Sequence, residues 1–284
     1  MPAFEARPGM PYWIDLFSSE LRKSSYFYSR IVGWDAQGAD MPGADDQGDD
    51  DGSYRVARVQ GLPVAGLVAQ KTDSSGTDMP DAWVTYFYTT DIERDSEKVA
   101  QLGGRVLAEP AQVSLGKMAL CADVAGGWFG LFQPSGEDAF VAAGEPGTPV
   151  WHEYICTGDV QAVVDFYRSL FEWGVDHDNG YHVAMQDGAA FAGVWDASDT
   201  IPAEVPSFWQ TFLGVANVAQ VRGRVEELGG EIVRGPENSP FGVLLTVADS
   251  TGAVVTLCEV DEPVDEDELD EAESVLEVFD RHQA

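Results

Sequence analysis

Cysteine and basic residues are scarce in this sequence, and each shortage excludes a class of protein. The three cysteines, Cys121, Cys156 and Cys258, are scattered and form no CxxC pair, which argues against a disulfide framework and a structural zinc site. Lys and Arg number 16 against 49 Asp and Glu, so the net charge is −33. Such a charge repels phosphate backbones and anionic membranes. We therefore expect no nucleic-acid partner and no membrane partner.

Long apolar runs and nucleotide-binding motifs are also missing. No stretch approaches the about 18 apolar residues of a membrane span, and the start MPAFEARPGM has no basic segment followed by an apolar run. A P-loop, a dinucleotide-binding Gly pattern and a GxSxG elbow are absent, which argues against nucleotide-dependent chemistry and serine hydrolysis. We expect a cytoplasmic protein, whose acidity reflects either salt adaptation or an acidic surface without special meaning.

An internal repeat organises the chain. Trp83 and Trp209 stand 126 positions apart, and the Asp and Gly of two D-x-x-G segments keep the same spacing. Tyr28 and Tyr167, each in a Phe-Tyr pair before a Trp, stand 139 apart. The repeat predicts a first domain at 1–135 with an acidic loop at 35–53, a linker at 136–148, a second domain at 149–260, and an acidic helix or tail at 261–284.

Each repeat has the same succession of element signals. A short aromatic and β-branched segment, PYWIDLFSS or PVWHEYICT, is typical of a strand. The following segment DVQAVVDFYRSLF predicts a helix with Asp159 as N-cap and an apolar face, and a later helix ends at a Gly pair. Short strands follow each helix. A lobe therefore reads β-α-β-β-β twice, which gives an α+β chain of four such modules with curved mixed sheets around concave pockets.

This order of segments, present twice, resembles the vicinal-oxygen-chelate superfamily of glyoxalases, bleomycin-resistance proteins and extradiol dioxygenases. The resemblance extends to two-lobed actinobacterial glyoxalase-like proteins, some of them labelled hydroxylases, and it covers about nine-tenths of the chain. Enzymes of the superfamily take metal ligands from the first and last strands of each module. Of the eight matching positions only His152 is a good ligand here, and a stable site needs about three. We expect no metal and no other cofactor.

Strand alternation predicts which side chains face the pockets. Counting back from the Phe-Tyr tyrosine places Trp13 and His152 at equivalent inward positions. The inward aromatic and polar residues then predict a site for a flat apolar ligand, although such residues also pack cores. The predicted ligand-binding residues are Trp13, Phe17, Trp83, Thr85, Trp128, Tyr154, Trp195, Trp209 and Thr211.

Two inward residues are candidates for proton transfer. His152 is the one imidazole expected inside a pocket, with an ordinary pKa near neutrality. Asp15 has the inward phase in lobe one, where burial among aromatic rings would raise its pKa. Glu153 has the opposite phase to His152 and is expected at the surface.

The sequence leaves two functions open. The first is metal-independent binding of a small apolar or aromatic molecule. The alternative is a lyase, isomerase or cyclase that uses His152 or Asp15 as acid or base, and a metal-dependent glyoxalase or dioxygenase is the least favoured reading. The partner is thus a small molecule, and the chain is a monomer or a homodimer.

Overall fold

The computed structural model describes residues 3–38, 54–70, 80–113, 115–136, 140–178 and 180–262. Most of the predicted acidic loop and nearly all of the predicted C-terminal helix or tail lie outside these residues. The start of that loop differs from the prediction, because Asp35–Gly38 forms a strand, β3, that pairs with β4 (Tyr54–Val59).

Four modules of the type β-α-β-β-β follow one another along the chain, as predicted. In lobe one they are β2 (Pro11–Ser18), α1 (Leu21–Ile31), β3, β4 and β5 (Leu62–Ala69), then β6 (Ala82–Tyr88), α2 (Ile92–Gln101), β7 (Arg105–Val113), β8 (Gly116–Ala122) and β9 (Trp128–Pro134). In lobe two they are β11 (Pro149–Cys156), α3 (Val160–Phe171), β12 (Gly174–Asp178), β13 (Tyr181–Gln186) and β14 (Ala189–Asp196), then β15 (Phe208–Val215), α4 (Val218–Val225), β16 (Glu231–Ser239), β17 (Gly242–Ala248) and β18 (Val254–Glu259).

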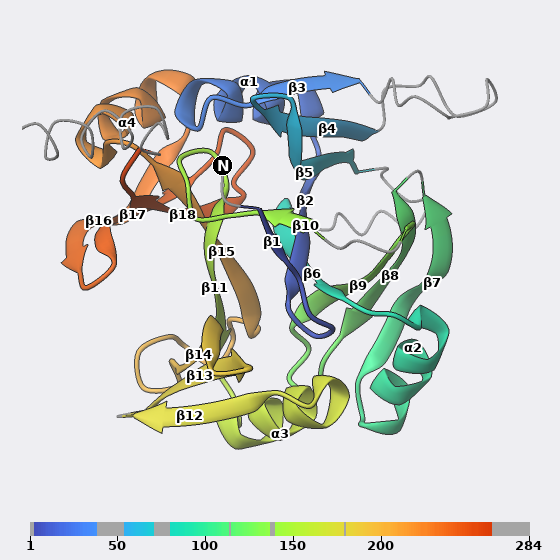
Figure 1. Cartoon of the computed structure of the whole chain (residues 1–284). Coiled ribbons are helices and arrows are strands. Elements are labelled where there is room, and N and C mark those ends of the chain that lie inside the picture. The colour runs from blue at the N-terminus through green and yellow to red at the C-terminus, as the bar shows by residue number, and fades with distance from the viewer. Residues whose placement is uncertain are drawn as a thin grey trace, which may run out of the picture.

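Each lobe contributes one mixed sheet of eight strands. The order is β3-β4-β5-β2-β6-β9-β8-β7 in lobe one and β12-β13-β14-β11-β15-β18-β17-β16 in lobe two. The first and last strands of every module are parallel neighbours, as β11 and β14 are, whereas the two modules of a lobe meet antiparallel, as at β11 and β15. Figure 1 shows the two sheets side by side with the helices above and below them. The predicted α+β tandem fold is confirmed.

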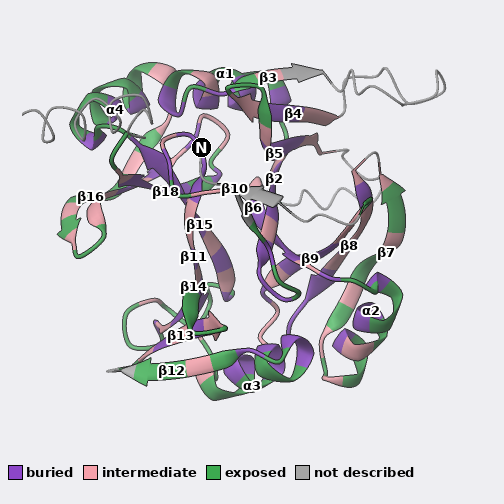
Figure 2. Ribbon diagram, in the orientation of Figure 1, coloured by how far each residue is buried: buried purple, intermediate pink, exposed green. Residues whose placement is uncertain are grey.

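The two largest hydrophobic cores are each built from both lobes. One joins the helix side of the α1 module to β15, α4, β17 and β18, with members such as Phe27 and Trp83 beside Val221 and Leu257. The other joins the α2 module to the α3 module, as Phe87 and Phe129 meet Tyr167. Figure 1 accordingly shows α1 next to α4 and α3 near α2, and the facing sides of these helices are buried in Figure 2.

Buried hydrogen bonds link the repeated motif residues, and one of these bonds connects the two lobes. The Tyr167 hydroxyl donates to Asp123 Oδ2 of the lobe-one D-x-x-G turn at 2.9 Å, and Trp209 Nε1 donates to the Tyr167 oxygen at 2.8 Å. In the symmetric position Trp83 Nε1 donates to the Tyr28 hydroxyl at 3.0 Å. Because these groups are buried, each bond also satisfies a polar atom that would be costly to leave unpaired.

Local signals read from the sequence explain where the elements begin and end. Asp159 caps α3, because its side chain accepts a hydrogen bond from the Ala162 amide at 3.1 Å. Gly103 follows α2, and Gly229 follows the 3₁₀ turn Glu226–Leu228 that continues α4; their φ angles of +91° and +82° are in the left-handed region that favours glycine. No helix in the described part of the chain is long and apolar enough to cross a membrane.

The segment between the lobes is packed against them. Its strand β10 (Phe140–Ala142) pairs antiparallel with β1 (Ala3–Glu5) near the N-terminus. Trp34 Nε1 donates to the Gly147 carbonyl at 2.7 Å, and Thr148 is fully buried. The expected linker is thus a structural element that ties the start of the chain to the junction of the lobes.

Candidate functional site

The concave face of the lobe-two sheet encloses a cavity of about 670 Å³, called here the lobe-two cup. Its walls are aromatic, and its floor carries a carboxylate, an amide and two hydroxyls. The Trp151 and Phe241 rings lie nearly parallel, with centroids 6.4 Å apart. The principal lining residues are Trp151, Glu153, Tyr181, Trp195, Gln210, Phe212, Arg234, Phe241, Leu244, Thr246, Thr256 and Cys258.

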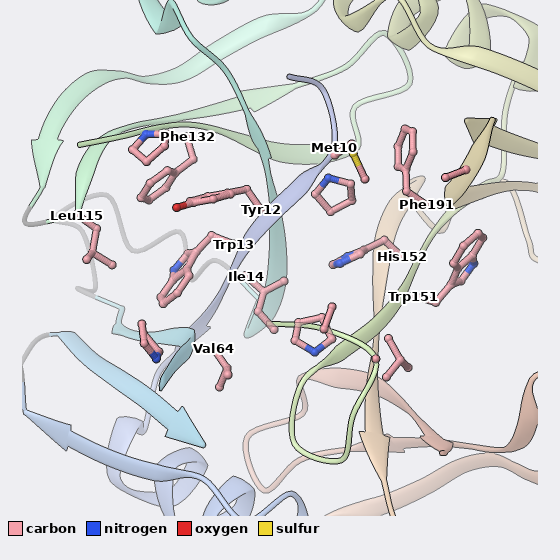
Figure 3. A pocket seen from close by; sticks show the side chains of 18 of the residues that line it. Met10, Tyr12, Trp13, Ile14, Val64, Leu115, Phe132, Trp151, His152 and Phe191 are labelled. Carbon is pink, nitrogen blue, oxygen red and sulfur yellow. The ribbon is translucent and has the colours of Figure 1, made fainter. Parts of the chain in front are cut away.

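A second cavity of about 680 Å³, the interlobe cavity, lies where the two lobes meet. Figure 3 shows Tyr12, Trp13 and Phe132 of lobe one on one side of it and Phe191 of lobe two on the other, with His152 between them. Trp151 lines both this cavity and the lobe-two cup. The described lining of the interlobe cavity is mostly apolar.

The concave face of lobe one is filled by its own side chains. A cluster of Trp13, Val56, Val84, Tyr86 and Phe132 occupies it, and Met118 and Leu120 pack against that cluster. The Phe132 ring lies 6.5 Å from the Trp13 ring and 5.1 Å from the Tyr12 ring, centroid to centroid. The concave space of lobe one is therefore a hydrophobic core, whereas that of lobe two remains open.

The lobes differ at the concave positions that decide this contrast. Gln210 is paired with Glu153 in lobe two, and Val84 is paired with Asp15 in lobe one, so Gln210 and Val84 occupy equivalent positions. The pairings of the other strands identify further equivalent positions. The registers match Val84 with Gln210, Leu120 with Thr246, Gly130 with Thr256 and Phe132 with Cys258. Lobe two thus has a smaller side chain where Phe132 fills lobe one, and polar groups where lobe one has none. This pattern points to the lobe-two cup as the functional site.

The same hydrogen-bonded triad of Trp, Tyr and acid lies in both lobes. In lobe two the Tyr181 hydroxyl donates to Glu153 Oε1 at 2.7 Å, and Trp151 Nε1 donates to the Tyr181 oxygen at 3.2 Å. In lobe one Asp15 Oδ1 accepts from Trp13 Nε1 at 2.8 Å and from the Tyr54 hydroxyl at 3.0 Å. In lobe two, Tyr181 passes over Gly193, where a Cβ atom would lie 1.9 Å from the tyrosine oxygen.

The expected surface position of Glu153 is wrong. Glu153 lines the lobe-two cup, and it corresponds to Asp15 rather than being out of phase with it. The error arises in the turn between strand and helix, because α1 starts three residues after β2 ends whereas α3 starts four residues after β11 ends. A count back from Tyr167 therefore falls one residue too late, and a one-residue slip exchanges the faces of a strand.

Several other predicted pocket residues face the helices. Tyr154 and Trp209 are buried in the second core, Trp83 in the first, and Thr85 and Thr211 are fully buried at the junction of the sheets; none of them lines either cavity. Trp195 lines the lobe-two cup, and Trp13 lines the interlobe cavity. Phe17 packs against the lobe-one cluster, and Trp128 is half-buried at the start of β9.

The two predicted acid–base residues are both buried, in different surroundings. His152 is 7% exposed and lines the interlobe cavity; its Nδ1 lies 3.1 Å from Thr85 Oγ1, and burial lowers its pKa to about 3. Asp15 is 2% exposed, and burial raises its pKa to about 6 although Trp13, Tyr54 and Tyr86 oppose the shift. Neither side chain lines the lobe-two cup.

The raised pKa of Asp15 predicts a pH-dependent contribution to stability. A carboxyl whose pKa is raised by folding stabilises the fold below its unfolded value, 3.8, and loses that contribution as pH rises through about 6. Because a pKa difference of one corresponds to about 1.4 kcal/mol, the rise of the Asp15 pKa from 3.8 to about 6 corresponds to about 3 kcal/mol of stability. Between about pH 3.5 and 7.5 we therefore expect the free energy of unfolding to fall by about 3 kcal/mol more in the wild type than in Asp15→Asn. Urea unfolding at both pH values measures it, and parallel pH profiles would contradict it.

The lobe-two cup does not offer the donor set of a divalent metal site. Among the described residues no group of three His, Cys, Asp or Glu side chains could hold a metal ion. The registered floor positions carry Glu153, Gln210 and Thr256, so one carboxylate is present, and Tyr181 already occupies one of its oxygens. Gln210 Nε2 donates to Thr256 Oγ1. Divalent metals are usually held by about three carboxylate, imidazole or thiolate groups.

Comparisons with known proteins agree with this geometry. Residues 150–257 match the model of the Glyoxalase/Bleomycin resistance protein/Dioxygenase superfamily. Over 275 residues the chain is 28% identical to the anthracycline biosynthesis protein DnrV of Streptomyces peucetius, with 90% of this chain and 94% of that protein covered.

Two solved structures share the fold. The Mn(II)-bound glyoxalase of Novosphingobium aromaticivorans has a TM-score of 0.60 at 14% identity and covers 90% of this chain and 84% of its own. An extradiol ring-cleaving dioxygenase of B. fuscum has a TM-score of 0.58 at 13% identity and covers 92% and 75%. Lobe two is thus similar in sequence to the glyoxalase, bleomycin resistance protein and dioxygenase superfamily, and the chain shares its fold with the two solved enzymes.

Proposed function

We propose that the lobe-two cup binds a small molecule with a flat aromatic body, and that it binds this molecule without a metal ion. The observation that carries the proposal is the difference between the lobes at matched registers. The repeat keeps the aromatic walls and the acid of the triad, but it replaces Phe132 by Cys258 and Leu120 by Thr246. An open cavity of about 670 Å³ with aromatic walls and a few polar groups is typical of small-molecule sites.

The rim residue Phe241 supports an aromatic ligand. Its side chain is 83% exposed, which is unusual for a large apolar residue, and its ring lies nearly parallel to that of Trp151. A planar ligand can extend this stack on the side of the cup, gaining both buried apolar area and ring contact. The DnrV relative is named for anthracycline biosynthesis, and an anthracycline carries a planar polycyclic core. A polycyclic aromatic molecule is therefore the class that we propose.

Titration with quinizarin, a planar dihydroxyanthraquinone, tests the proposal. Binding is followed by tryptophan fluorescence and by calorimetry in the presence of a chelator. We expect a one-to-one complex, and we expect Phe241→Ala to weaken it about tenfold, which corresponds to about 1.4 kcal/mol of lost stacking and burial. The matched lobe-one variant Leu115→Ala, whose side chain lines the interlobe cavity, is expected to bind quinizarin like the wild type.

Three results would contradict the proposal. Weakening by Leu115→Ala and none by Phe241→Ala would place the ligand in the interlobe cavity. No binding of quinizarin or of any other planar aromatic probe would remove the proposed ligand class. About one iron, manganese, zinc or nickel ion per chain in protein purified without an affinity tag, together with loss of quinizarin binding when that ion is removed, would overturn metal independence.

A further inference from the structure

The carboxyl group of Glu153 is held in a fixed orientation within the lobe-two cup. Glu153 lies mid-strand on β11, directly opposite Gln210 of β15 and next to Gly193 of β14. The absence of a side chain at Gly193 lets Tyr181 of β13 reach across β14 to Glu153 Oε1 at 2.7 Å. A strand carboxylate fixed by a neighbouring tyrosine is preorganised, which is the arrangement that proton transfer requires.

The hydrogen bonds around Tyr181 have one consistent direction. Trp151 Nε1 can only donate a hydrogen bond, so it donates to the tyrosine oxygen at 3.2 Å. The tyrosine proton is then directed to Glu153 Oε1. In the described part of the chain no hydrogen bond to Glu153 Oε2 is present, and the residue lines the cup. One oxygen of the carboxylate is thus anchored while the other can meet a ligand.

The charges around Glu153 are compatible with a proton acceptor at neutral pH. Burial raises the pKa of Glu153, while the bond from Tyr181 and the charge of Arg234 lower it. Arg234 also lines the cup and is paired with Glu237 at 3.1 Å. A carboxylate in a largely apolar cavity is a stronger base than one in water, because its charge is less well solvated.

Gln210 supplies a hydrogen-bond donor beside the carboxylate. Its Nε2 donates one proton to Thr256 Oγ1, and Thr256 is in turn 3.0 Å from Thr246 Oγ1. An amide nitrogen carries two protons, so a second N–H remains for a ligand oxygen. The cup therefore combines a base and a donor on adjacent strands, the pairing that stabilises an enolate as it forms.

Lobe one shows what the same triad does without an open cup. Asp15 is bonded to Trp13 and Tyr54, but it is 2% exposed, and Val84 stands where lobe two has Gln210. The triad of lobe one is structural. Lobe two retains the acid, has an open cavity in front of it and adds the Gln210 donor. These three features occur together in the lobe that a small molecule can enter.

We propose that Glu153 is a catalytic acid–base residue that isomerises an enolisable ketone on an aromatic ligand; this rests on the proposed function of the same cup. Glu153 Oε2 takes a proton from the carbon next to the carbonyl group. The C–H electron pair becomes the C=C bond of the enolate as the carbonyl π pair moves to the oxygen, which accepts a hydrogen bond from the Gln210 amide. The protonated Glu153 then returns the proton to carbon or oxygen, so no oxidant, reductant or cofactor is consumed.

Proton exchange in β-tetralone, an aromatic-fused ketone with an acidic CH₂ group, tests this step directly. Deuterium incorporation from D₂O is followed by NMR with wild-type protein and with Glu153→Gln. We expect the wild type to accelerate exchange and Glu153→Gln to lower the catalysed rate at least about 100-fold, with the Kd for β-tetralone changed only a few-fold. Asp15→Asn, the matched lobe-one variant, is expected to exchange at the wild-type rate.

Tyr181 is a positioning residue in this scheme, and its variant has a distinct readout. The bond from Tyr181 lowers the pKa of Glu153, so Tyr181→Phe raises that pKa and moves the rise of the exchange rate to higher pH. β-Tetralone or quinizarin bound in the cup without accelerated exchange would overturn the acid–base role and leave the binding function intact. Exchange that survives Glu153→Gln would also overturn it. Absence of any aromatic binding would refute both proposals.

Discussion

Neither half of the chain is expected to fold as a monomer when residues 1–135 and 149–262 are produced separately. Each eight-stranded sheet is complete within one half, so the loss does not arise from broken strand pairing in these sheets. It arises because the two largest hydrophobic cores contain residues of both lobes. Separation would expose one side of the core that joins α1 to α4 and one side of the core that joins α2 to α3.

The energetic scale makes partial folding unfavourable. Exposing a buried Val, Leu, Ile or Phe side chain costs about 1.5–3 kcal/mol, whereas a domain is stable by only about 5–15 kcal/mol. The lobe-two contribution to the first core alone includes Leu213, Val221, Leu245 and Leu257. In addition, the buried hydrogen bond from Tyr167 to Asp123, which connects the two lobes, is lost.

Circular dichroism, chemical denaturation and light scattering measure the result. We expect each half alone to show no cooperative unfolding transition as a monomer, and an equimolar mixture to recover the spectrum and cooperative unfolding of the full chain. The intact protein cut once between residues 136 and 139 provides the control, because its two pieces are already assembled. A cooperative transition in either monomeric half would show that a lobe is stable without the cores that it shares with the other lobe.

The fold could be read from the sequence because its signals are local and occur twice. Asp159 marks the start of a helix, Gly103 and Gly229 mark helix ends, and the spacing of Trp83 and Trp209 reveals the repeat. Local signals do not show which face of a β-strand packs against the other lobe. Trp83 and Trp209 were placed in pockets, but they serve cores that exist only when two lobes pack together.

The site was read less accurately because both faces of each sheet are aromatic. On such a sheet, apolar alternation cannot identify the concave face, and a single extra residue before α3 was enough to invert β11. A different alignment of the two repeats gives the correct pairing of the two acids. The segments Trp13-Ile14-Asp15 and Trp151-His152-Glu153 match at a spacing of 138 rather than 139, which would have paired the two acids. Tyr181 and Gln210 become neighbours of Glu153 only through the strand order.

Replacing Cys258 by Phe is expected to abolish ligand binding in lobe two. Cys258 lines the cup at the register that Phe132 occupies in lobe one, and Phe132 fills the concave space there by packing on Trp13 and Tyr12. In Cys258→Phe the new ring should lie in the space beside Trp151 that we assign to the ligand. We expect the affinity for quinizarin to fall at least about 100-fold, equivalent to about 2.7 kcal/mol, in a calorimetric titration.

The Cys258→Phe result can be separated from a folding defect. Thermal unfolding establishes whether the variant retains the fold, since an overpacked side chain costs about 1–3 kcal/mol when the surroundings must move. Cys258→Ala, which removes the thiol and adds no bulk, should bind quinizarin with nearly wild-type affinity. Folded Cys258→Phe that still binds like the wild type would mean that the ligand does not occupy the lobe-two cup. Because Trp151 also borders the interlobe cavity, the ligand would then have to lie on the other side of that ring, where Leu115→Ala would weaken it.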